Sequence, residues 1–109
     1  MTSTTLNGAS VLLLGATGGL GRALGEELAA RGAALTLVGR DQQRLDQLTV
    51  AGPRVALDLR SPDACAAAVR TAVEHHGKLD VVINAVVGSP LFGEYQFLWD
   101  LRMVQRKCF

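Results

Sequence analysis

The stretch "SVLLLGATGGLGRALGEEL", residues 10–28, decides the fold of this chain. Its first five residues form an apolar run that glycine ends, which is typical of a strand buried inside a parallel sheet. Leu20, Leu24 and Leu28 then recur at the spacing of one helix face. Between the two lies a cluster of four glycines: Gly15, Gly18, Gly19 and Gly21. A turn from a strand into a helix gathers free backbone N–H groups at the positive helix end, so we expect an anion site here.

The rest of the chain repeats this alternation of strand and helix. Apolar runs predict further strands at residues 34–38, 54–57 and 79–83. Asp41 and Ser61 are expected to begin the second and third helices, and Gly32, Gly52 and Gly77 to end the three helices. Because right-handed crossovers join parallel strands, the sequence predicts an α/β fold: a truncated, Rossmann-like doubly wound sheet of strand order 3-2-1-4. Residues 1–8 are expected to be a tail, 9–88 a partial dinucleotide-binding domain, and 89–109 a second tail.

Composition excludes several classes of partner. The formal net charge of the 109 residues is +1 and no basic stripe is visible, so we expect no nucleic acid. No apolar stretch reaches the roughly 18 residues of a membrane span, and the first residues do not read as a secretory signal. Two cysteines are too few for a disulfide framework, and Cys65, His75 and His76 lack the spacing of metal ligands. We therefore expect a cytoplasmic protein without a metal site.

The aromatic residues mark a change in the chain. All five lie in the last 18 residues: Phe92, Tyr95, Phe97, Trp99 and Phe109. Three interpretations of this tail are open. The tail could cover the exposed face of the sheet, form an interface with another chain, or be the product of an altered reading frame or splice.

Four motifs in this order resemble the N-terminal half of a short-chain dehydrogenase/reductase. They are "LLLGATGGLGRAL" (residues 12–24), "LTLVGRD" (35–41), "ALDL" (56–59) and "LDVVINA" (79–85). The resemblance covers about residues 8 to 88 and implies hydride transfer with a nicotinamide dinucleotide. The spacing Gly15-x-x-x-Gly19-x-Gly21 fits the classical branch of that family. The alternative spacing through Gly18 keeps the atypical and extended branches open.

The resemblance also implies a set of residues around the cofactor. The pyrophosphate would lie on the glycine motif: Gly15, Thr17, Gly18, Gly19, Leu20 and Gly21. Asp58 would accept a hydrogen bond from the adenine amino group, with help from the backbone N–H of Leu59. Asn84 would line the cofactor cleft. The match ends there, because Ala85, Val86 and Val87 replace the Asn-Ala-Gly that follows this asparagine in the family.

The residues after the second strand favour NADP over NAD. Gly39 occupies the position where NAD-binding proteins of this fold carry a carboxylate for the ribose hydroxyls. Arg40 follows it, and Arg22 stands just beyond the glycine motif. A guanidinium binds a phosphate through two parallel hydrogen bonds, so these two arginines are the expected ligands of a 2′-phosphate.

The catalytic pair of the resembled family is absent from this sequence. That family uses a tyrosine as proton donor, with a lysine four residues later. The single tyrosine here, Tyr95, is followed four residues later by Trp99. We therefore expect an NADP(H)-binding portion of an oxidoreductase without catalytic residues of its own. The alternatives are a non-catalytic interaction or regulatory subunit that forms homo- or hetero-oligomers through the fourth strand and the tail, an active site completed by a partner chain, and a truncated or frame-altered product.

Overall fold

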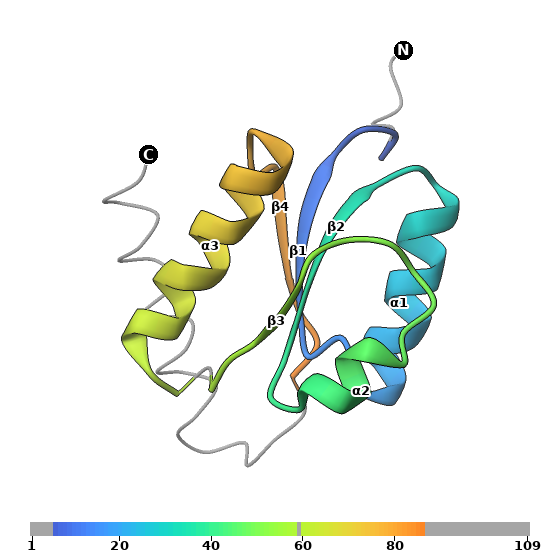
Figure 1. Cartoon of the computed structure of the whole chain (residues 1–109). Helices are drawn as coiled ribbons and strands as arrows, with labels where there is room; N and C mark the ends of the chain where they lie inside the picture. The colour runs from blue at the N-terminus through green and yellow to red at the C-terminus, as the bar shows by residue number, and fades with distance from the viewer. Residues whose placement is uncertain (1–5, 59, 87–109) are drawn as a thin grey trace.

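The structure is a computed structural model of the chain, and it describes residues 6–58 and 60–86. Its elements in chain order are β1 (Ser10–Leu14), α1 (Gly19–Ala30), β2 (Ala34–Gly39), α2 (Gln42–Asp46), β3 (Arg54–Ala56), α3 (Pro62–His76) and β4 (Val81–Asn84). Within these residues the strands form one parallel sheet of order β3-β2-β1-β4 (Figure 1). The predicted fold and strand order are confirmed.

Helices cover both faces of the sheet. α1 and α2 lie on one face and α3 on the other (Figure 1). Alternate residues of β1 serve the two sides: Val11 and Leu13 join the core toward α1, while Leu12 and Leu14 join the core toward α3. All five residues of β1 are buried, as expected for a central strand with a layer on each face. In the described part of the chain, no helix is long and apolar enough to cross a membrane.

The predicted helix ends are largely confirmed. Asp41 accepts a hydrogen bond from the backbone N–H of Gln43 at 2.9 Å and so caps α2. Gly32 after α1 and Gly77 after α3 both have positive φ, which suits glycine at a helix end. Ser61 is the N-cap residue of α3, although its side chain makes no capping hydrogen bond.

The second helix is shorter than the leucine spacing predicted. α2 ends at Asp46, so the prediction that Gly52 ends it is wrong, and Leu48 lies beyond the helix although it is buried in the core. The reason is Arg54, whose guanidinium binds four backbone carbonyls of this segment. Nε donates to Leu45 at 2.9 Å, Nη1 to Gly52 at 2.9 Å, and Nη2 to Leu48 at 2.8 Å and Val50 at 2.7 Å. Arg54 therefore holds residues 47–52, and the end of α2 before them, against the sheet.

This role of Arg54 predicts a loss of stability in Arg54→Lys. An ammonium has three donors at one point and cannot reach four separated carbonyls, so we expect the free energy of unfolding to fall by about 2 kcal/mol. Urea denaturation followed by circular dichroism measures it. Arg44→Lys, at an exposed position of α2, is the matched control and should change stability little. Equal effects of the two substitutions would show that the loop does not depend on Arg54.

Candidate functional site

The turn after β1 folds against the end of β2. Gly15 has a φ of 78°, and its N–H and that of Ala16 both donate to the carbonyl of Val38 at 3.0 Å. The N–H of Gly18 then donates to the carbonyl of Gly15 at 3.3 Å, and α1 begins at the next residue. The turn is therefore fixed by backbone bonds to its own strand end and to the neighbouring strand.

The glycines of this turn are of two kinds. A Cβ on Gly21 would collide with the carbonyl oxygen of Gly15, and a Cβ on Gly15 would lie 2.8 Å from the backbone of Ala85. Packing inside the protein alone accounts for these two glycines. A Cβ on Gly19, in contrast, would meet no atom within 4 Å, and one on Gly18 would meet only the Gly15 carbonyl at 3.8 Å. Packing inside the protein gives no reason for these two.

The first turn of α1 presents unpartnered hydrogen-bond donors. The first N–H of the helix to find an acceptor is that of Arg22, which donates to Gly18 at 2.9 Å. Within the described residues, the N–H groups of Gly19, Leu20 and Gly21 have no acceptor, and the N-cap Gly18 has no side chain to supply one. No acidic side chain stands in this turn. The site is suited to an anion, because donors and the positive helix end coincide.

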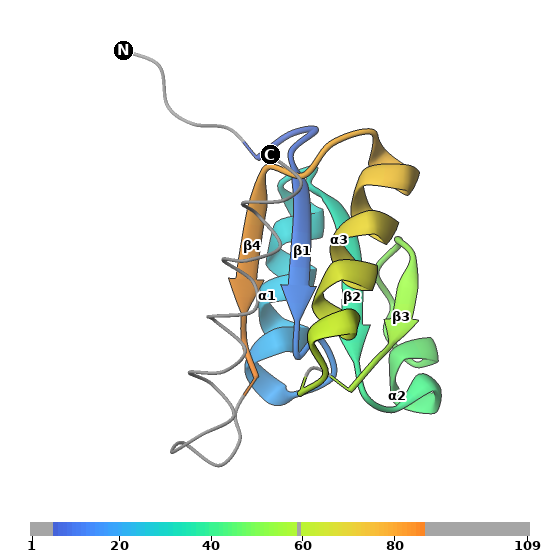
Figure 2. The same ribbon diagram turned by 90° about the vertical axis from the view of Figure 1, so that its left-hand side faces the viewer.

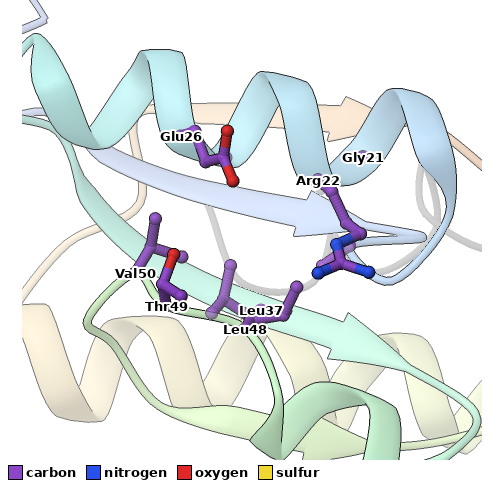
Figure 3. A pocket seen from close by; sticks show the side chains of 9 residues that line it. Gly21, Arg22, Glu26, Leu37, Leu48, Thr49 and Val50 are labelled. Carbon is purple, nitrogen blue, oxygen red and sulfur yellow. The ribbon is translucent and has the colours of Figure 1, made fainter.

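The end of β2 supplies no carboxylate and is tightly packed. Gly39 is buried, and a Cβ there would lie 3.3 Å from the side chains of both Thr17 and Leu45. Arg40, the next residue, is exposed. Arg22 also reaches toward β2, beside a shallow crevice between α1 and residues 48–50 (Figure 3).

An ion pair that sequence reasoning missed stands after β3. Asp58 Oδ1 accepts from the backbone N–H and from Nε of Arg60, both at 3.0 Å, and Oδ2 accepts from Nη2 of Arg60 at 2.9 Å. These bonds, the side-chain ones first, lower the pKa of Asp58 to about 2, and the charge of Arg40 adds to the effect. The only signal in the sequence was the Asp-x-Arg spacing, which is too common to indicate a pair. Leu59 lies outside the described residues.

Asn84 lies at the end of β4, on the opposite side of β1 from Gly39 and Asp58. It is the last residue of β4, paired in register with Leu14, and its Oδ1 accepts the N–H of Val86 at 3.0 Å. The N–H of Ala85 donates to the carbonyl of Leu14 at 2.8 Å, so the chain after β4 passes beside Gly15.

The structure brings the predicted positions together along one end of the sheet, where its four strands terminate. The glycine turn, Gly39 with Arg40, Asp58 and Asn84 follow the carboxyl ends of four parallel strands, which all point the same way (Figure 2). In open parallel sheets this end, where the strand order reverses, is the usual place for a ligand. Residues 6–58 and 60–86 hold no group of three His, Cys, Asp or Glu side chains that could bind a metal ion.

The amino-acid sequence matches a known protein family and individual members of it. Residues 9–97 match the family model described as "short chain dehydrogenase". A stretch of 90 residues is 36% identical to 11-beta-hydroxysteroid dehydrogenase 1A of Arabidopsis thaliana and covers 75% of this chain. Another of 81 residues is 40% identical to the short-chain reductase protein NovJ of Streptomyces niveus and covers 67% of this chain. The chain spans only 26% and 30% of the length of these two relatives.

Solved structures of oxidoreductases share the fold of this chain. A metagenomic short-chain oxidoreductase in complex with NADP superimposes with a TM-score of 0.71 at 27% identity, over 97% of this chain and 57% of that one. The citronellol catabolism dehydrogenase of Pseudomonas aeruginosa superimposes with a TM-score of 0.74 over 93% of this chain and 52% of its own. At 22% identity, the second comparison shows the fold alone.

The two kinds of glycine predict opposite effects on stability. Gly21→Ala forces a Cβ into the Gly15 carbonyl and should lower the free energy of unfolding by about 3 kcal/mol or more. Gly19→Ala meets open space at a helical position, and we expect a gain of up to about 1 kcal/mol. Thermal unfolding of the two variants beside the parent chain measures the difference. A Gly19→Ala chain as unstable as Gly21→Ala would contradict the assignment.

Proposed function

The chain belongs to the short-chain dehydrogenase family, and we propose that it is the NADP(H)-binding N-terminal portion of an oxidoreductase of that family. Proteins of this family bind a nicotinamide dinucleotide. The observation that carries the proposal is the turn after β1, where three backbone N–H groups have no acceptor in the described part of the chain and Gly19 leaves open space beside them. A pyrophosphate would supply the missing acceptors and use that space.

The roles of the turn residues follow from this placement. In the proposal, the N–H groups of Gly19, Leu20 and Gly21 bind the pyrophosphate, and Gly18 leaves room beside it. Gly15 and Gly21 bring the helix close to the strand, and Thr17 packs beside Gly39 at the ribose end. The bound cofactor would accept or donate a hydride at its nicotinamide ring. In the proposal, the residues around the turn after β1 orient that cofactor.

The preference for NADP rests on the end of β2. Gly39 supplies no carboxylate, so the usual ligand of an unphosphorylated ribose is missing there, and a Cβ at this position would press on Thr17 and Leu45. Arg40 and Arg22 supply positive charge on either side, and a similar structure was solved in complex with NADP. We propose that both guanidinium groups bind the 2′-phosphate.

The remaining assignments concern the two outer strands. Asp58 accepts the adenine amino group in the proposal, the N–H of Leu59 assists it, and Asn84 lines the cleft toward the nicotinamide. The sequence contains no Tyr-x-x-x-Lys pair. We therefore expect this chain to bind and orient the cofactor without supplying the proton donor that carbonyl reduction needs.

Substitution of Arg40 tests the choice of cofactor. Arg40→Ala should weaken NADP⁺ binding by about tenfold or more, the worth of hydrogen bonds to a charged group, and should change NAD⁺ binding less than about twofold. Isothermal titration calorimetry with both dinucleotides measures it.

Two further variants give this test its controls. Arg31→Ala removes the same charge just beyond the far end of α1 and should leave both affinities unchanged. Gly19→Ala should weaken both dinucleotides alike, because its methyl group occupies the pyrophosphate space. Equal losses of NADP⁺ and NAD⁺ affinity in Arg40→Ala would refute the 2′-phosphate assignment. A folded parent chain that binds neither dinucleotide would refute the proposed function.

A specific feature of β4 also favours association with another chain. Among the described residues β4 pairs with β1 alone, and Val81 on it is 37% exposed. An unpaired strand edge is a template for further strand pairing, so we propose a homo- or hetero-oligomer formed through β4. The tail of residues 89–109, predicted to share in that contact, lies outside the described residues. Analytical ultracentrifugation should show self-association that Val81→Lys reduces, and a monomer at every concentration would contradict the homo-oligomer.

A further inference from the structure

The ion pair after β3 combines side-chain and backbone hydrogen bonds. Arg60 supplies all three hydrogen bonds that the Asp58 carboxylate accepts within the described residues, at 2.9–3.0 Å. An ionised carboxylate has about four acceptor positions, so roughly one stays open. Arg60 therefore fixes the orientation of the Asp58 carboxylate and leaves it able to accept one further donor.

A second arginine lies close to this pair. The N–H of Leu57 donates to the carbonyl of Gly39 at 2.8 Å, which places the residue before Asp58 beside the residue before Arg40. The charge of Arg40 acts on Asp58 as well, in the direction that keeps the carboxylate ionised. Arg40, Asp58 and Arg60 thus gather where β2 and β3 end, and the carboxylate of Asp41, beside Arg40, is engaged in capping α2.

This gathering creates an electrostatic conflict for the proposed cofactor. Asp58 is the proposed acceptor of the adenine amino group, and Arg40 a proposed ligand of the 2′-phosphate. A carboxylate close to a phosphate raises the free energy of the phosphorylated cofactor, because like charges repel. NAD has no phosphate at this position and would not experience the repulsion.

We propose that Arg60 is a positioning residue that sets the selectivity for NADP over NAD by acting through Asp58. It holds the carboxylate with one acceptor position toward the adenine and offsets its negative charge, so that a 2′-phosphate binds nearby on Arg40. The inference rests on the proposed function. It adds a residue outside the glycine motif and the end of β2 to the determinants of cofactor choice.

The competing role for Arg60 is purely structural. Its N–H closes a turn on Asp58 just before α3, and the N–H of Ser61 donates to the Asp58 carbonyl at 3.1 Å. If Arg60 only supported that turn, its substitution would weaken NADP⁺ and NAD⁺ alike. Selectivity, the ratio of the two dissociation constants, separates the two roles.

The experiment is a double-mutant cycle on selectivity. Dissociation constants for NADP⁺ and NAD⁺ are measured by calorimetry for the parent chain, Arg60→Gln, Asp58→Asn and the double variant. Side chains of Asp58 and Arg60 are 50% and 75% exposed, so we expect Arg60→Gln to reduce the preference for NADP⁺ by about threefold to fivefold. In the Asp58→Asn background, which keeps an acceptor oxygen without the charge, the same substitution should change the preference little.

Two further measurements show that the variants are folded and altered as intended. NMR titration should find the pKa of Asp58 near 2 in the parent chain and raised toward its ordinary value in Arg60→Gln, since the side-chain bonds are lost and the backbone bond stays. Arg31→Gln removes the same charge far from β3 and should leave the pKa and the selectivity unchanged.

Each remaining outcome is decisive. An unchanged NADP⁺ preference in Arg60→Gln, with the parent chain binding NADP⁺, overturns the inference and leaves the proposed function intact. An equal loss of preference in both backgrounds also overturns it, because Arg60 would then bind the phosphate directly. A folded parent chain that binds neither dinucleotide overturns the proposed function and this inference with it.

Discussion

The close approach of α1 to the end of β1 is the constraint on which the site depends. Gly21 packs its backbone on the carbonyl of Gly15, a contact that any side chain at position 21 would abolish. This contact brings the N-terminus of α1 down onto the sheet edge. Because the helix starts there without a side-chain cap, its first N–H groups point to the same edge that the ends of β2, β3 and β4 share. One steric requirement therefore positions the anion-binding donors relative to every other residue of the site.

The charges at this edge follow the same geometry. The N-terminus of α1 contributes a partial positive charge, and Arg22 in α1, Arg40 after β2 and Arg60 after β3 add three full ones along this end of the sheet. Two carboxylates lie near them: Asp41 caps α2, and Asp58 after β3 accepts three hydrogen bonds from Arg60. A multiply charged anion would thus meet donors at the turn and cations at its rim. The proposed NADP, with a pyrophosphate at one point and a further phosphate at another, would be such an anion.

Much of the fold could be predicted because it depends on local patterns. Glycine with positive φ ends α1 and α3, Asp41 caps α2, and continuous apolar runs form the buried strands. The length of α2 could not be predicted, because it depends on Arg54, a residue of β3 that binds carbonyls up to nine positions earlier. For the site, the positions of the glycine turn and of Gly39 could be predicted from the motifs. The crowding around Gly39 and the partner of Asp58 could not, since both depend on which side chains the tertiary fold brings together.

The unpartnered polar groups of the described residues differ in what they mean for function. The N–H groups at the start of α1 sit at exposed residues such as Gly19 and Leu20, where water or a ligand can bind them at little cost. The hydroxyls of Ser10 and Thr36 are fully buried and have no partner within the described chain, on the face of the sheet that packs against α3. Burying such a hydroxyl costs about 1–3 kcal/mol, and no ligand can reach it there. Exposure, more than the missing partner itself, therefore makes the turn after β1 the better candidate for a ligand site.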